Sequence, residues 1–117
     1  MAIKGEEQAI QDSIRVALAE HGYVVFRANV GKFKKADGRW FDAGLPSGFP
    51  DLFGYKPENG RIFFLEVKTP KGKRQFKQII FANGLRGKNV IYGVVRSADE
   101  ALNIVDNELK ILNDRGN

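Results

Sequence analysis

The sequence predicts a single α/β domain, and three observations support this class. The chain has 117 residues, a length that suits one compact domain with one core. Hydrophobic residues make up 43% of it and charged residues 28%, a balance typical of a globular protein. Segments with helical periodicity alternate with short β-branched and aromatic runs, in the order α-β-β-β-α-β-α.

The first part of the chain predicts a helix, a strand and a long loop. Ile10, Ile14 and Leu18 recur at helical spacing within residues 6–21, and Gly22 is a suitable C-terminal cap. The run 23–28 is β-branched and aromatic, as in strands. Residues 29–48 are rich in glycine and lysine, and we interpret them as a long basic loop with room for a short hairpin.

The second part predicts a β-hairpin followed by two helices and another strand. Apolar runs at 52–55 and 61–68 flank a turn at 56–60. A helix is expected over 73–84, a strand over 89–95 and a last helix over 98–112. Ser97 and Glu100 have the spacing of a capping box before that helix. The polar tail from Asn113 is expected to fray.

Composition excludes several functional classes. The chain has no cysteine, which excludes disulfides, thiolate zinc sites and a cysteine nucleophile. Its N-terminus lacks the apolar segment of a signal peptide, and no run reaches the roughly 20 apolar residues of a membrane helix. We therefore expect an intracellular, cytoplasmic protein without a membrane partner. A net charge of +5 favours polyanions, of which nucleic acid is the commonest.

Charged residues at the end of the run 61–68 indicate a chemical site. Glu66 and Lys68 are two residues apart, so they lie on the same face of a strand that is apolar on both faces. Such a strand is expected to be central, where a charge is costly unless it is paired or bound to a metal. Asp51 begins the preceding strand, and hairpin geometry brings it close to Glu66 or Lys68.

This arrangement suits a magnesium ion acting on a phosphate ester. Two carboxylates hold Mg²⁺ while it keeps several waters, and the ion lowers the pKa of an attacking water. Lys68 would then orient or deprotonate that water, or stabilise the developing charge. Spacing alone fits equally well with a solvated pair between Glu66 and Lys68 at a strand end.

Four motifs resemble one nuclease family. Gly48-Phe49-Pro50-Asp51-Leu52 and Phe64-Leu65-Glu66-Val67-Lys68 match the PD-(D/E)XK nuclease pattern. With Gly72 and Gln78, and then Val94-Val95-Arg96-Ser97, the chain resembles the virus-type replication-repair nuclease (VRR-NUC) domain over nearly its whole length. The resemblance implies a restriction-endonuclease-like fold, in which helices flank a mixed central sheet.

The same resemblance implies site residues and a cofactor. It implies phosphodiester hydrolysis with Mg²⁺ or Mn²⁺ held by Asp51, Glu66 and the backbone carbonyl of Val67, with Lys68 assisting the water. The family adds an acidic residue from the first helix and a glutamine, Gln78, from the second. Gln78 is otherwise an ordinary solvated helix residue.

Glu7 is our choice for the helical acid, because it shares the inward face with Ile10 and Ile14. Glu6 and Glu20 are the alternatives. The competing interpretation is that Glu7 only stabilises the positive end of its helix.

Basic residues flank these motifs on both sides and are expected to bind a nucleic-acid backbone. Asn29 lines the cleft in the resembling pattern, or is a turn residue. Phe33, Trp40 and Phe41 are expected to stack on exposed bases, or to cover the core or a dimer partner. The basic residues are Lys32, Lys34, Lys35, Arg39, Lys71, Lys73 and Arg74.

The function expected from these features is that of a metal-dependent, structure-specific DNA endonuclease. The resemblance implies a homodimer that cuts branched DNA such as four-way (Holliday) junctions, in phage or bacterial replication and repair. A flap nuclease is the nearest variant. A non-catalytic nucleic-acid-binding module and a protein-interaction domain remain the alternatives from other classes.

Overall fold

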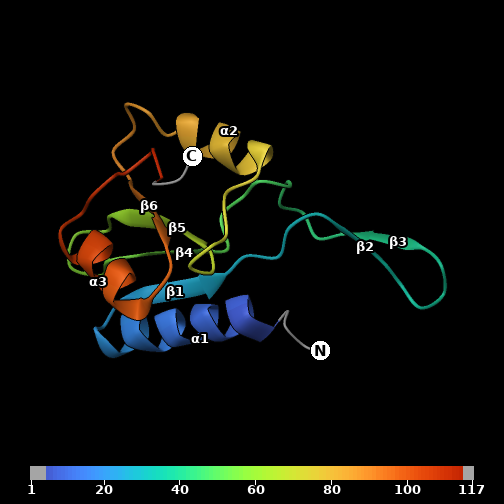
Figure 1. The fold of residues 1–117 in the computed structure, drawn as a ribbon, viewed down its shortest axis with the longest axis horizontal. Coiled ribbons are helices and arrows are strands. Elements are labelled where there is room, and N and C mark those ends of the chain that lie inside the picture. The colour runs from blue at the N-terminus through green and yellow to red at the C-terminus, as the bar shows by residue number, and fades with distance from the viewer. Residues whose placement is uncertain (1–4, 115–117) are drawn as a thin grey trace.

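A mixed four-stranded sheet organises the chain, with the strand order β1-β4-β5-β6 (Figure 1). The computed structural model describes residues 5–114. The strands are β1 (Val24–Arg27), β4 (Leu52–Tyr55), β5 (Ile62–Val67) and β6 (Ile91–Val95). β4 pairs antiparallel with β1 and with β5, whereas β6 runs parallel to β5. The predicted α/β class and the hairpin around residues 56–60 are confirmed, and β5 is a central strand.

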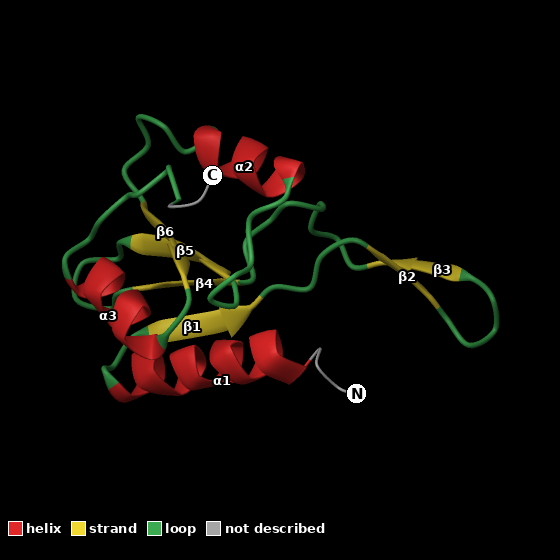
Figure 2. Cartoon of the chain, viewed as in Figure 1, coloured by secondary structure: helices red, strands yellow, loops and turns green. Residues whose placement is uncertain are grey.

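Helices cover both faces of this sheet (Figure 2). α1 (Gly5–Glu20) and α3 (Ala98–Asp106) pack on one face, and α2 (Phe76–Asn83) lies over the other. Because the side chains of a strand alternate, every second residue of β5 faces α1 and α3, and these residues are fully buried. The core on this face comprises Ile14, Leu18, Leu52, Phe63, Leu65, Val67, Ile91, Val95, Ala101, Ile104 and Val105.

A second, aromatic layer lies between the sheet and α2. The ring of Phe49 makes edge contacts with Phe53, Phe64 and Phe81, at centroid distances of 5.6, 5.8 and 5.2 Å. Phe81 comes from α2, and it also packs on Phe64 at 5.4 Å. Edge-to-face geometry of this kind is favourable for aromatic pairs. The contacts of Phe49 hold the segment that precedes Asp51 against both the sheet and α2.

Residues 29–48 contain the short hairpin for which the sequence left room. β2 (Lys32–Lys34) and β3 (Trp40–Asp42) form a separate antiparallel pair. This pair and the turn that joins it, residues 32–42, form what we call the arm, which extends away from the main sheet (Figure 1).

The prediction of a helix over 98–112 is wrong beyond residue 106. The backbone turns at Glu108, whose φ is +52°. The following segment pairs with the edge strand β6, because the Tyr92 amide donates to the Leu109 carbonyl and the Ile111 amide donates to the Tyr92 carbonyl. Covering the exposed edge of a sheet outweighs helical periodicity here. Ser97 caps α3 as predicted, by accepting from the Glu100 amide, but the Glu100 carboxylate accepts from the amide of Arg96.

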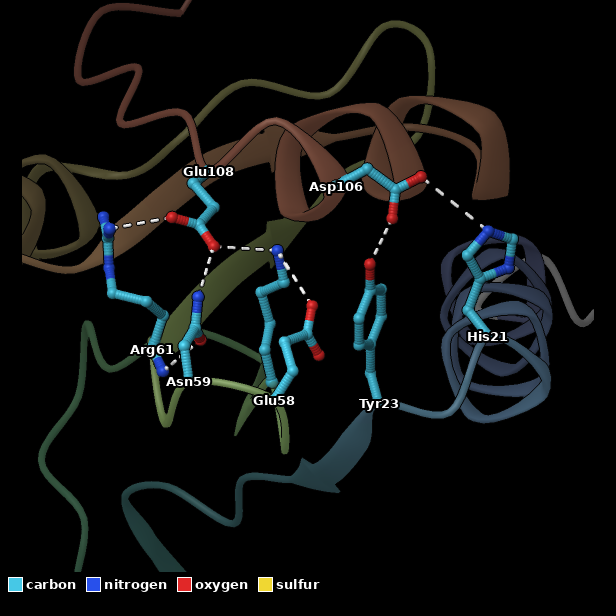
Figure 3. A network of polar contacts seen from close by, with 8 residues as sticks. His21, Tyr23, Glu58, Asn59, Arg61, Asp106 and Glu108 are labelled. Carbon is cyan, nitrogen blue, oxygen red and sulfur yellow. Dashed lines mark hydrogen bonds and ion pairs between the residues drawn. The ribbon is translucent and has the colours of Figure 1, made fainter.

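Charged groups hold that turn in place (Figure 3). The Glu108 carboxylate accepts hydrogen bonds from Lys56, Asn59 and Arg61, each at 2.8 Å. The hydrogen bond from Lys56 is the main cause that lowers the pKa of Glu108. These contacts tie the turn between β4 and β5 to the end of α3, at the end of the sheet remote from Asp51.

Two further predictions need correction. The helix expected over 73–84 begins at Phe76, because Gln75 is extended and residues 72–75, which follow a turn at 70–71, have no regular secondary structure. The tail was expected to fray from Asn113, but the Asp114 side chain is 5% exposed and paired with Arg96. The rest of that tail lies outside the described residues.

Gly48 fixes the approach of the aromatic segment to α2. Its φ is +96°, and a Cβ atom there would lie 2.5 Å from the Lys77 carbonyl oxygen. Both the positive φ and the close approach therefore require glycine. Since Asp51 follows three residues later, the packing of Gly48 on α2 also positions that carboxylate.

Gly48→Ala should destabilise the protein more than a glycine substitution that only strains the backbone. Gly44 is the matched control, because its φ is +101° and a Cβ there would have no atom within 4 Å. We expect a loss of about 1–2 kcal/mol for Gly44→Ala and about 1–3 kcal/mol more for Gly48→Ala. Urea unfolding of both variants measures the difference, and equal losses would contradict the packing role of Gly48.

Candidate active site

Asp51 and Glu66 meet at one edge of the sheet because of the hairpin register. Leu52 pairs with Leu65 in an antiparallel register, so Asp51, just before Leu52, lies opposite Glu66, just after Leu65. The Val67 amide donates to Oδ2 of Asp51 at 2.9 Å and anchors this carboxylate on β5. The N–H and C=O of one strand residue point to the same side. The Val67 carbonyl therefore also faces the side where Asp51 lies.

Glu66 is the most buried of the charged residues at this edge, with 1% of it exposed. Its Oε2 accepts a hydrogen bond from Nε2 of Gln78 at 2.8 Å, and Nζ of Lys68 lies 3.9 Å from the same oxygen. Burial raises the pKa of Glu66, and the nearby charge of Asp51 raises it further, to about 10. Lys68 opposes this rise only in part.

Gln78 is oriented by two contacts at once. Its Oε1 accepts from the backbone amide of Gln75 at 2.7 Å, so its amide nitrogen is directed toward Glu66. The start of α2 is thereby linked directly to the buried carboxylate. The sequence placed Gln78 near the site through family resemblance alone, since helical periodicity does not distinguish it from Gln75.

Glu7, in the first turn of α1, is close enough to Asp51 and Lys68 for both charges to affect its pKa. Glu7 is half-buried; burial raises its pKa, the charge of Asp51 adds to the rise, and Lys68 opposes it. Glu6 is exposed, and Glu20 is exposed at the opposite end of α1. Of the three candidates, Glu7 is the one that is half-buried and whose pKa responds to Asp51 and Lys68.

Gln11 is a buried polar residue that the sequence analysis missed. It is 7% exposed, one helical turn after Glu7 and on the same inward side of α1 as Ile14 and Leu18. Its Oε1 has no hydrogen-bond partner among the described residues. The available signal was a glutamine interrupting the apolar stripe of α1.

The carboxylates fit a divalent cation. Oε1 of Glu66 is buried and has no hydrogen-bond partner within residues 5–114. A buried carboxylate oxygen without a donor, beside a second carboxylate, is stabilised when a cation neutralises the pair. In the same part of the chain, no three His, Cys, Asp or Glu side chains form a complete ligand group. The set that fits is therefore small: Asp51, Glu66 and the Val67 carbonyl, with water for the remaining positions.

The loop after β5 is held by Arg96. Its guanidinium donates to the Thr69 carbonyl at 3.2 Å and to the Gly72 carbonyl at 2.8 Å, and it makes two bonds with Asp114 at 3.0 and 2.9 Å. This bonding to Asp114 raises the pKa of Arg96. The planar fork of arginine is suited to this set of acceptors. We call this arrangement the Arg96 clasp; it fixes the segment 69–72 directly after Lys68.

The basic residues divide into three groups. On the arm, Lys32, Lys34, Lys35 and Arg39 are exposed, and Asn29 is exposed at its base. Lys71 and Lys73 are exposed in the loop held by the Arg96 clasp. Arg74 differs from them, because it is 7% exposed and donates to the hydroxyl of buried Tyr92 at 3.4 Å.

This geometry defines a class: an α/β protein in which a mixed sheet brings two carboxylates and a lysine together at one edge. The family follows from comparison. The model of the VRR-NUC domain matches residues 5–99, so the chain belongs to the VRR-NUC family of nuclease domains. A solved structure described as a VRR_NUC domain has the same fold, with a TM-score of 0.62 at 24% identity over 86% of this chain and 95% of that chain. Comparison with curated proteins gives no match.

The metal-free protein should lose stability as the pH rises. The pKa of Glu66 is about 10 in the fold against an ordinary 4.5, so only the folded state keeps this proton between those values. Stability from this group is full below pH 4.5 and falls above it, by up to about 1.4 kcal/mol per pH unit. Glu66→Gln should flatten the slope between pH 6 and 8, roughly the range where carboxylates in solution are already ionised. Urea unfolding in chelator measures it.

The control for this experiment is Glu20→Gln, which removes an exposed carboxylate of α1. It should leave the slope unchanged. If Glu66→Gln and wild type lost stability with the same slope, Glu66 would not be protonated in the metal-free fold.

Arg96→Lys should loosen the loop that follows Lys68. Lysine keeps the charge but cannot make the four hydrogen bonds of the clasp, and we expect a loss of about 1–3 kcal/mol. Hydrogen exchange of the Gly72 amide, which donates to the Thr69 carbonyl, should become faster. Arg86→Lys is the control, because Arg86 is exposed and its side chain donates to Asn83, a neighbour in the same segment. Unchanged exchange at Gly72 would argue against the clasp.

Proposed function

We propose that this VRR-NUC domain is a metal-dependent, structure-specific DNA endonuclease that hydrolyses phosphodiester bonds. The observation that carries the proposal is the buried Glu66 oxygen without a partner, beside Asp51 and within reach of Lys68. A binding module has no need for a second buried carboxylate at this position, where it costs stability. Family membership supports the nuclease class.

Each residue of the site has a proposed role. Asp51, Glu66 and the Val67 carbonyl would hold Mg²⁺ or Mn²⁺, with Glu7 contributing through water or directly. The bound ion supplies Lewis-acid activation of the phosphate and of the attacking water. Lys68 orients that water and stabilises charge that develops on the phosphate. Gln78 keeps Glu66 in position through its hydrogen bond.

The proposed substrate is branched DNA, and four-way junctions are the leading candidate. The exposed lysines on the arm and after β5 provide phosphate contacts that are independent of sequence. A homodimer would present two sites related by a two-fold axis, which suits two symmetric cuts. The proposed setting is replication or repair in a phage or bacterium, and a flap nuclease is the closest alternative.

None of the helices within residues 5–114 has both the length and the apolar character that a membrane span needs.

Cleavage of labelled four-way junction, flap and linear duplex DNA tests the proposal. Wild-type protein with Mg²⁺ or Mn²⁺ should cut the junction preferentially, and chelator should abolish cutting. Lys68→Ala should slow cleavage by about 100- to 1,000-fold with little change in DNA binding, because Lys68 acts on the reacting groups. Lys88→Ala, at an exposed lysine between α2 and β6, should cut normally. Salt-sensitive binding without cleavage under either metal would leave only the binding module.

A further inference from the structure

The arm presents aromatic rings on both of its faces. Partners in an antiparallel pair share a face, so Phe33 and Phe41 lie together on one side. Lys34 and Trp40 are also partners, and they lie together on the other side. Phe33 is 50% exposed, Phe41 51% and Trp40 66%. These rings are therefore accessible although aromatic side chains are normally well buried.

Rings on both faces indicate what the arm contacts. A hairpin that covers a core or lies flat on another protein has one apolar face and one polar face. The arm has no such division, because one face carries a pair of rings and the other carries a ring beside an ammonium group. A two-stranded ribbon of this kind is suited to insertion between groups that accept rings on either side. Unpaired nucleic-acid bases are such groups, since every base has a flat surface on which an aromatic ring stacks.

The base of the arm is attached to the candidate active site. The Ala28 amide donates to the Asp51 carbonyl at 2.8 Å, directly before the arm leaves the sheet. The returning strand is linked to the outgoing one by the Gly31 amide, which donates to the Leu45 carbonyl at 2.9 Å. The arm therefore begins next to Asp51 and extends from there away from the main sheet (Figure 1).

Charge on the arm is complementary to a phosphate backbone. Residues 32–42 contain four basic residues, Lys32, Lys34, Lys35 and Arg39, and two acidic ones, Asp37 and Asp42. Arg39 is paired with Asp37 at the tip, at 3.0 Å, and Lys32 is opposite Asp42. Lys34 is left beside Trp40, which places a cation next to a stacking ring. Two arms that packed on each other would bring these like charges together.

Resting on the proposed nuclease function, we propose that the arm binds unpaired nucleotides at an opening or branch point of the DNA. Trp40 stacks on one base and Lys34 contacts the neighbouring phosphate. Phe33 and Phe41 stack on a base at the opposite face. The arm thereby selects DNA that contains unpaired bases and binds it on an extension whose base adjoins Asp51.

Trp40 is the only tryptophan of the chain, so its fluorescence reports directly on the arm. Metal-free protein in chelator is titrated with an oligothymidylate and with a fully paired hairpin duplex. Stacking should quench the fluorescence with the oligothymidylate and much less with the duplex. By anisotropy of labelled DNA, Trp40→Ala should weaken oligothymidylate binding about 5- to 100-fold. Lys34→Ala should lower the salt dependence of binding by about one phosphate contact.

Phe76→Ala is the matched control, because Phe76 is 76% exposed on α2, outside the arm. It should change neither quenching nor affinity. The inference is overturned if the oligothymidylate binds without quenching, or if Trp40→Ala binds it as tightly as Phe76→Ala does. It is also overturned if fluorescence depends on protein concentration alone and Trp40→Ala dissociates a dimer, since the arm would then be a protein interface.

The titration needs no cleavage, so failure of the nuclease proposal can be distinguished from failure of the proposal that the arm binds unpaired nucleotides. Quenching without cleavage of any DNA would retain the arm and remove the nuclease. Cleavage of branched DNA that Trp40→Ala leaves unchanged, together with unchanged oligothymidylate binding, would retain the nuclease and remove the role of the arm.

Discussion

The hydrogen bond from the Val67 amide to the Asp51 carboxylate is the interaction on which the candidate site depends. It forms because β4 and β5 are adjacent antiparallel strands whose register sets Leu52 against Leu65. Burial of one face of the hairpin under α1 and α3 fixes this register, because a shift of one residue would turn the buried side chains toward the other face. Packing on one side of the sheet thus determines where charges meet on the other.

The proximity of Asp51 and Glu66 destabilises the folded protein when no cation is bound. Glu66 is almost fully buried, one of its oxygens has no partner among the described residues, and a second carboxylate lies beside it. The surrounding structure holds the arrangement nonetheless: Gln78 donates to Glu66 from α2, and Phe49 and Gly48 pack the segment before Asp51 onto that helix. Groups whose pKa values are perturbed in this way are characteristic of functional sites. The same network links the site to α2.

Much of the fold follows from local pattern. Helical spacing located α1, alternating and β-branched runs located the strands of the sheet, and the turn at 56–60 identified the hairpin. Errors occurred where a distant contact overrides local preference. α3 ends early because Glu108 is held by Lys56, Asn59 and Arg61 and the next residues pair with β6. Asp114 is ordered because Arg96 binds it, and no local signal announces a partner 18 residues away.

The sequence by itself determined the α/β class, the hairpin that brings Asp51 to Glu66, and the family motifs around them. These are short-range features, governed by side-chain periodicity and by the reach of a tight turn. Only the tertiary structure decided that Glu66 is buried with an unpartnered oxygen, that Arg74 points into the protein, and that the arm carries rings on both faces. Burial, strand partners and charge neighbours depend on which elements pack together, and that is a property of the whole chain.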